Sequence, residues 1–131
     1  MDSSVLRDVL GADPTFGDRS RRALRACLGE GPLIACDVVW AEVSSAFDSP
    51  REAAKTLAEA QLDLSSLTAT AAEAAGATWR TYRAQGGSRE RMIADFLIGA
   101  HALVQADRLL TRDRGFYRSY FRRLRIVDPS S

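Results

Sequence analysis

Four acidic residues lie where an α/β fold would bring their side chains together. Asp2 opens the segment DSSVL, Glu42 lies in VVWAEV, Asp95 lies in ADFLIGAHA, and Asp113 closes LLTRD. Each lies at or just beyond an apolar run that can form a strand, or in the first turns of the helix that follows one. Because ligands bind at the carboxyl ends of parallel strands, we expect the four side chains to converge there.

A pocket with four carboxylates predicts a bound divalent cation. Like charges raise each other's pKa unless something neutralises them. Mg²⁺ and Mn²⁺ prefer oxygen ligands, so either ion suits this set. The predicted chemistry is metal-assisted hydrolysis of a phosphoester, with Asp2 and Asp95 as principal ligands and with Glu42 and Asp113 binding directly or through water. A phosphatase for small phosphoesters would use the same carboxylates and is an alternative.

The sequence evidence for a functional role differs in strength among the four residues. Asp95 is the strongest, because its neighbours along the chain are almost all apolar and a charge among them requires a partner. Taken alone, Asp113 fits a turn or a helix cap, Glu42 fits a solvated helix face, and Asp2 fits an unstructured N-terminus. The only histidine, His101, is expected to be a hydrogen-bonded core residue.

Arginines and aromatic residues alternate near the end of the chain. Single-stranded nucleic acid requires this combination, for its phosphates and for base stacking. In the alternative, the aromatic residues cover the sheet edge and the arginines are solvated. Arg112 and Arg114 flank Asp113 and are the best candidates for contacting a substrate phosphate, followed by Arg118. The segment comprises Arg112, Arg114, Phe116, Tyr117, Arg118, Tyr120, Phe121, Arg122, Arg123 and Arg125.

Length and composition predict one globular domain over residues 1–131. The chain is 46% hydrophobic and 27% charged, with a net charge of +1. Cys27 and Cys36 lack the spacing of a metal site and read as reduced thiols. No apolar stretch is long enough to span a membrane and no signal peptide is evident, so we expect a cytoplasmic protein.

Strands and helices are predicted to alternate, which favours an α/β fold with a parallel sheet covered on both faces. Asp37 is expected to cap a helix that runs to Phe47, Ser49 to open a helix with a capping box, and Thr70 to open a long helix with another. The predicted strands are residues 32–36, 62–64, 109–111 and 125–127, and further helices are expected near residues 18–28 and 93–106.

The beginning of the chain does not fit this pattern. If Asp2 ends a first strand, only Met1 is left to form it, whereas a strand normally has about five residues. We expect either that the true start lies upstream or that the sheet lacks most of one strand. In the second case Asp2 should be poorly held and metal affinity lowered.

The ordered segments DSSVL, AEV, DFLIGAHA and LLTRD resemble those of PIN-domain ribonucleases, and within that class VapC-type toxins of toxin–antitoxin pairs. The resemblance covers nearly the whole chain. It implies a three-layer α/β/α fold on a parallel sheet of four or five strands, with the first strand truncated here. It also implies that Asp2, Glu42, Asp95 and Asp113 bind one or two Mg²⁺ or Mn²⁺ ions.

The same resemblance implies an endoribonuclease that cuts exposed single-stranded loops of RNAs such as tRNA or ribosomal RNA. It further implies a homodimer and a cognate antitoxin that blocks the active site. Because the N-terminus departs from the family pattern, a catalytically impaired module that binds RNA or a partner is the alternative.

Overall fold

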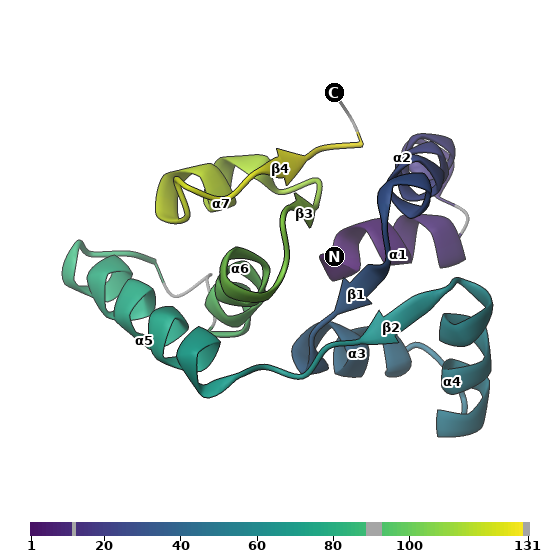
Figure 1. Cartoon of the computed structure of the whole chain (residues 1–131), viewed down its shortest axis with the longest axis horizontal. Coiled ribbons are helices and arrows are strands. Elements are labelled where there is room, and N and C mark those ends of the chain that lie inside the picture. Colours follow the sequence, from purple (N-terminus) through teal and green to yellow (C-terminus); the bar gives the residue numbers. More distant parts are fainter. Residues whose placement is uncertain (12, 89–92, 130–131) are drawn as a thin grey trace.

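The computed structural model describes residues 1–11, 13–88 and 93–129, which form an α/β arrangement of helices and short strands (Figure 1). None of the helices in these ranges is both long and apolar enough to cross a membrane. The elements in chain order are α1 (Ser3–Leu10), α2 (Gly17–Glu30), β1 (Leu33–Ala35), α3 (Asp37–Ser44), α4 (Pro50–Glu59), β2 (Leu62–Leu64), α5 (Ala69–Ala84), α6 (Ile93–Gln105), β3 (Leu109–Leu110), α7 (Arg114–Tyr120) and β4 (Ile126–Val127).

The strands pair in parallel, as predicted, but in two separate pairs. β1 pairs with β2, with Leu33 opposite Leu62, and β3 pairs with β4, with Leu109 opposite Ile126. The described strands therefore form two two-stranded sheets instead of one continuous sheet of four or five strands.

The first two residues lie between these sheets and connect them. The Met1 ammonium donates to the Ile34 carbonyl of β1 at 2.9 Å, and the Asp2 amide donates to the Leu110 carbonyl of β3 at 2.9 Å. The N-terminus accordingly lies between β1 and β3 in Figure 1. Neither residue is assigned to a strand, and α1 begins directly after them. The two sheets are therefore connected through these two backbone hydrogen bonds.

Capping residues set the helix starts, and the sequence predicted one of three correctly. The Ser49 hydroxyl accepts from the Glu52 amide at the start of α4, as expected. The predicted cap at Thr70 is wrong, because the Thr68 hydroxyl caps α5. Asp37 does not cap α3 either. Its carboxylate accepts from the Leu67 amide at 2.7 Å and ties the segment before α5 to α3.

The aromatic residues of the C-terminal segment form core. Phe116, Tyr117 and Phe121 are at most 7% exposed. Phe116 and Phe121 pack with Phe96 of α6, whose ring centroid lies 5.2 Å from that of Phe116, and Tyr117 packs with Phe116 and Phe121. The interpretation of these three rings as base-stacking surfaces is therefore wrong, because the rings lie in the core, where a base cannot reach them. Their burial stabilises the fold instead. The packing holds α6, which carries Asp95, against α7, which follows Asp113.

A substitution at Gly99 tests this packing. A Cβ atom at Gly99 would clash with the buried Phe121 ring, so Gly99→Ala should destabilise the protein by about 1–3 kcal/mol. Gly76 in α5 is a matched control, because a Cβ atom there would meet no other atom within 4 Å, and Gly76→Ala should stabilise by about 0.5–1 kcal/mol. Urea unfolding of both variants measures the difference. Equal stabilities would contradict the close contact between α6 and Phe121.

Candidate functional site

Asp2 is firmly held, although no strand precedes it. Its residue is 8% exposed, and Oδ2 accepts hydrogen bonds from the Thr111 hydroxyl at 2.7 Å and the Ser4 hydroxyl at 3.3 Å. Asp2 is the residue before α1, yet its side chain does not cap that helix and points toward the loop after β3 instead. The expectation that a short first strand would leave Asp2 poorly held is wrong, because these hydroxyls and the bond from its amide to Leu110 position it.

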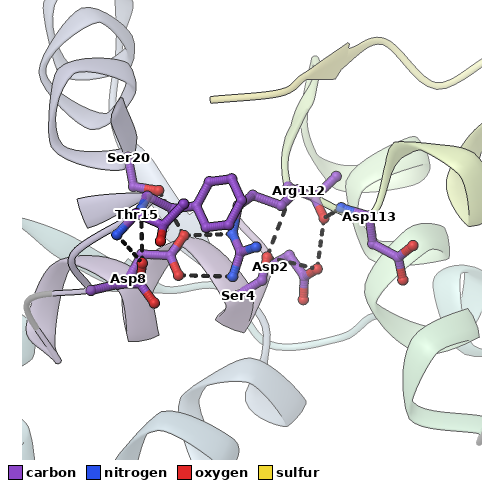
Figure 2. Close-up of polar contacts among 10 residues, drawn as sticks. Asp2, Ser4, Asp8, Thr15, Ser20, Arg112 and Asp113 are labelled. Carbon is purple, nitrogen blue, oxygen red and sulfur yellow. Dashed lines mark hydrogen bonds and ion pairs between the residues drawn. The ribbon is translucent and has the colours of Figure 1, made fainter. Parts of the chain in front are cut away.

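Thr111 links two of the four predicted carboxylate residues. It is fully buried, its hydroxyl donates to Asp2, and the same oxygen accepts from the Asp113 amide at 3.0 Å (Figure 2). The hydroxyl thereby fixes the backbone at Asp113 relative to the Asp2 carboxylate. This role of Thr111 was not predicted. A hydroxyl residue two positions before an acidic residue in LLTRD is the signal that could have shown it.

Replacing Thr111 by valine should weaken both stability and the site. The change keeps the shape and removes the hydroxyl, which leaves the Asp113 amide and the buried Asp2 carboxylate each without one bond. We expect a loss of about 1–3 kcal/mol in the free energy of unfolding. Thr111→Ser, which retains the hydroxyl, is the control and should recover most of this loss. If the valine and serine variants unfold at the same denaturant concentration, the bridging hydroxyl contributes nothing.

A buried ion pair lies beside this hydroxyl network. The Arg112 guanidinium donates to both carboxylate oxygens of Asp8, at 2.6 and 2.8 Å, and its Cζ lies 4.1 Å from the centre of the Phe16 ring. The Asp8 side chain is 3% exposed and also accepts from the Ser20 hydroxyl at 2.8 Å. Figure 2 shows Arg112 extending over α1 toward Asp8, while Asp113 points the other way.

This ion pair changes the interpretation of Arg112. The guanidinium predicted to contact a substrate phosphate is engaged with Asp8, so its evident role is to fasten the loop after β3 to α1. The Arg112 amide adds to this connection by donating to the Ser4 hydroxyl at 3.4 Å. The role of Asp8 was not predicted, because its partner Arg112 lies 104 residues later in the chain.

Glu42 of α3 has one carboxylate oxygen that needs a partner. Its Oε1 is buried and has no hydrogen-bond partner among the described residues, and its Oε2 lies 3.8 Å from Arg7 of α1. Burial raises the pKa of the Glu42 carboxyl above its ordinary value. The Arg7 guanidinium opposes this rise in pKa, and the charges of Asp2 and Asp95 increase it. The charges of Asp2 and Asp95 therefore act on the Glu42 carboxyl.

The raised pKa of Glu42 leads to a prediction about stability. The fold favours the neutral carboxyl, so stability falls as the pH rises from the ordinary value of 4.5 through the higher pKa of the folded protein. Glu42→Gln should therefore raise Tm by about 1–3 °C at pH 7 and by much less at pH 4. Thermal unfolding at the two pH values measures this. A lower Tm for the variant at pH 7 would show that attraction to Arg7 outweighs the cost of burial.

Asp95 and Asp113 complete the predicted set. Asp95 lies in the first turn of α6 and is half-buried. Asp113 occupies the position before α7, but its side chain makes no capping hydrogen bond, so the interpretation of Asp113 as a helix cap is not supported. Within residues 1–11, 13–88 and 93–129, no three acidic, histidine or cysteine side chains lie close enough together to hold a metal ion.

The chemistry of these residues nevertheless fits a hard divalent cation. Carboxylate oxygens are the ligands that Mg²⁺ and Mn²⁺ prefer, and Mg²⁺ retains several of its own waters, so a few carboxylates suffice. The buried Oε1 of Glu42 is an acceptor without a donor among the described residues, and a cation would satisfy it. Asp2, Glu42 and Asp95 carry carboxylates of the kind that such a cation prefers, and Thr111 connects Asp113 to Asp2.

Arg114 and Arg118 are the remaining candidate residues. Arg114 is half exposed and lies 3.5 Å from Asp128, and Arg118 is exposed on α7. His101 is 2% exposed and its Nε2 lies 3.0 Å from the Ser65 hydroxyl, so the prediction of a hydrogen-bonded core histidine is confirmed.

Two solved structures share this fold. The crystal structure of VapBC2 from Rickettsia felis bound to a DNA fragment from their promoter matches with a TM-score of 0.74 and 17% identity, over 96% of this chain and 94% of that chain. VapBC-1 from nontypeable Haemophilus influenzae matches with a TM-score of 0.74 and 14% identity, over 99% of this chain and 96% of that chain. No curated protein sequence matches the chain significantly.

The sequence itself matches a family model. The model of the PIN domain covers residues 1–122, a span that includes all four acidic residues, the hydroxyl of Thr111 that joins Asp2 to Asp113, and the ion pair of Asp8 with Arg112. The match extends over most of the chain, and the structural likenesses agree with it. This chain belongs to the PIN domain family.

Proposed function

We propose that this protein is a Mg²⁺- or Mn²⁺-dependent endoribonuclease that hydrolyses phosphodiesters in single-stranded or loop RNA. The observation that carries the proposal is the group of interacting carboxylates, in which the buried Oε1 of Glu42 lacks a donor among the described residues and the charges of Asp2 and Asp95 raise the pKa of Glu42. Carboxylates that raise one another's pKa destabilise a fold, and groups with such raised pKa values occur often at functional sites.

The roles of the residues follow from where they are held. Asp2, Glu42 and Asp95 would bind the cation, and Asp113 would bind it directly or through water. When bound, a divalent cation lowers the pKa of water for attack on phosphorus and stabilises charge on the phosphate oxygens. Thr111 holds Asp2 and Asp113 at a fixed position relative to each other through its hydroxyl. The ion pair of Arg112 with Asp8 connects the loop after β3, which contains Thr111 and Asp113, to α1.

RNA would be held by arginines outside the carboxylate group. Arg118 is exposed and Arg114 is half exposed, so both can reach phosphates, whereas Arg112 is committed to Asp8. Charge reversal at Arg118 should therefore weaken RNA binding in a salt-dependent way and leave the fold unchanged.

The two similar structures are of VapBC complexes, and this likeness supports a role as the toxin of a toxin–antitoxin pair. We propose that this chain forms a homodimer, acts in the cytoplasm on tRNA or ribosomal RNA loops, and is inhibited by a cognate antitoxin protein. Growth arrest on expression, relieved by coexpressing the partner or by Asp95→Asn, tests this role. Unchanged growth on expression of a protein that cuts RNA in vitro would contradict it.

One observation favours a second candidate, a catalytically impaired module that binds RNA or a partner. No three of the described acidic, histidine or cysteine side chains lie close enough together to hold a cation. Binding of a labelled RNA in Mn²⁺ and in EDTA separates the two functions. A binding module should hold RNA equally in both and cut it in neither.

A further inference from the structure

Tyr120 differs from the other three aromatic residues of the C-terminal segment. Its ring is only half-buried, whereas those of Phe116, Tyr117 and Phe121 are at most 7% exposed. The ring packs on the core, with its centroid 5.2 Å from that of Tyr82 of α5 and 5.5 Å from that of Phe116. Its remaining surface lines a groove. Tyr120 therefore presents part of an aromatic ring to the outside of the protein in a fixed position.

The groove lies between the C-terminal half of α5 and the end of α7, two segments that Figure 1 shows on the same side of the molecule. Its volume is about 360 Å³, at the lower end of the range of about 300–1,000 Å³ that small-molecule sites occupy. This volume suits a group of the size of one nucleotide. Thr78, Thr81 and Gln85 line the wall formed by α5, and Ser119, Tyr120 and Arg122 line the other wall.

The hydroxyls on both walls can only accept hydrogen bonds from an occupant. The Thr81 hydroxyl donates to the Ala77 carbonyl at 3.2 Å, and the Ser119 hydroxyl donates to the Gly115 carbonyl at 2.9 Å. Because a hydroxyl has a single hydrogen, each of these oxygens retains acceptor capacity alone. A phosphate oxygen is itself an acceptor and does not match them. The amino and ring N–H groups of a nucleobase are donors and do match them.

A positive charge lies beside the half-buried ring. Arg122 is exposed, follows the end of α7 and is two residues from Tyr120. Single-stranded nucleic acid is bound by this pairing, in which a guanidinium contacts a phosphate and an aromatic ring stacks on a base. Gln85, exposed on the opposite wall, carries an amide that both donates and accepts. The groove is thus complementary to a base with its adjoining phosphate.

Arginines along α7 connect the groove to the carboxylates. α7 begins directly after Asp113, and its seven residues span about 10 Å. Arg114, Arg118 and Arg122 follow one another at intervals of four residues, so the first two lie on one face of the helix. Arg118 is exposed and Arg114 is half exposed. An RNA strand with its scissile phosphate at the carboxylates can therefore follow these arginines to the groove.

We propose that the groove between α5 and α7 binds one base of the RNA substrate, outside the carboxylate site. Tyr120 stacks on this base, and the hydroxyls of Thr81 and Ser119 accept hydrogen bonds from its edge. Arg122 binds the adjoining phosphate. The choice of RNA as the occupant rests on the proposed function, but binding in the groove requires no metal ion.

Fluorescence anisotropy of a labelled single-stranded RNA of mixed sequence, measured in EDTA, tests the groove. EDTA removes every contact made through a metal ion and prevents metal-dependent cleavage. Tyr120→Leu should weaken binding by roughly tenfold, because stacking is lost while an apolar side chain remains, and Tyr120→Phe should retain the affinity. Arg122→Glu should reduce the slope of log affinity against log salt concentration by about 0.7. Arg51→Glu, at an exposed position of α4, is its control and should not change the slope.

A second variant fills the groove without altering the aromatic core. Thr81 is exposed, and leucine favours a helix more than threonine does, so Thr81→Leu should fold normally. It should weaken RNA binding by roughly fivefold or more, because the base can no longer reach Tyr120. Ala72→Leu is the matched control, since Ala72 is exposed on the opposite face of α5. An abasic RNA with the same number of phosphates should bind Tyr120→Leu as tightly as it binds the unmodified protein.

Two results would overturn the proposal. In the first, the unmodified protein binds no RNA in EDTA, or Tyr120→Leu and Thr81→Leu bind it as tightly as Tyr120→Phe and Ala72→Leu. In the second, the two variants change the oligomeric mass measured by light scattering and not the affinity for RNA, so that the groove is a contact between copies of the chain. Either result beside normal cleavage in Mn²⁺ would leave the ribonuclease function standing. Groove-dependent RNA binding without cleavage in Mn²⁺ would instead support this site and refute that function.

Discussion

Asp95→Asn should reduce the rate of metal-dependent RNA cleavage by at least about 1000-fold, which corresponds to about 4 kcal/mol of transition-state stabilisation. Asp95 is half-buried in the first turn of α6, and its charge acts on Glu42. The amide has the same shape but is neutral, so the cation would lose an anionic ligand. Single-turnover cleavage of a labelled loop RNA in Mn²⁺ measures the loss.

The fold should survive this substitution, because asparagine has the shape of aspartate and removes one of the charges that raise the pKa of Glu42. Tm of Asp95→Asn should lie close to that of the unmodified protein. Asp107→Asn is the matched control. Asp107 is exposed and precedes β3, whereas Asp113 follows that strand, and the Asp107 carboxylate forms an ion pair with Arg108 at the surface. This control should cleave RNA at the normal rate. Full activity in Asp95→Asn would show that Asp95 is not part of the active site.

Arg112→Ala should destabilise the protein by about 2–4 kcal/mol. Removing the guanidinium takes two hydrogen bonds from the Asp8 carboxylate, which is 3% exposed, and leaves it the bond from the Ser20 hydroxyl. Breaking a buried ion pair by deleting one partner is costly because the other charge stays buried. The estimate lies below that for a fully buried pair because the Arg112 side chain is 29% exposed.

A double-mutant cycle with Asp8→Ala isolates the pair. Because the double variant no longer buries an unpaired carboxylate, it should be more stable than Arg112→Ala alone. Arg21→Ala is the control for an exposed ion pair, since Arg21 and Asp18 are 41% and 86% exposed, and it should cost less than about 1 kcal/mol. Urea unfolding of Arg112→Ala, Asp8→Ala, the double variant and Arg21→Ala measures these differences in the free energy of unfolding. Equal effects of Arg112→Ala and Arg21→Ala would show that the loop after β3 is not fastened to α1 through this pair.

The parts of the fold that follow local rules could be predicted from the sequence. The apolar runs indicated all four described strands, the Ser49 cap was correct, and His101 lies in the core as expected. The helix α1 was not predicted, because Asp2, Ser3 and Ser4 fit the end of a strand equally well. The position of Asp2 depends on hydroxyls from Ser4 and Thr111, and the second of these is 109 residues away.

The arginines show a different limit of sequence-based prediction. Arg112 and Arg114 are alike in the sequence, on either side of Asp113, and both were predicted to contact phosphate. Only tertiary structure distinguishes them. Arg112 donates two short hydrogen bonds to Asp8, 104 residues earlier, whereas Arg114 lies 3.5 Å from Asp128 and its side chain is 49% exposed. The buried aromatic residues around them were equally ambiguous, since the same pattern suits a base-stacking surface and a packed core.

The most direct test of the proposed function is cleavage of total RNA by the unmodified protein, with Mn²⁺ and with excess EDTA, beside Asp95→Asn. We expect discrete RNA fragments with Mn²⁺, none with EDTA, and none from Asp95→Asn under either condition. Cleavage that persists in EDTA, or that Asp95→Asn retains, would contradict a metal-dependent active site built on these carboxylates. RNA binding without cleavage in Mn²⁺ would instead establish the impaired binding module.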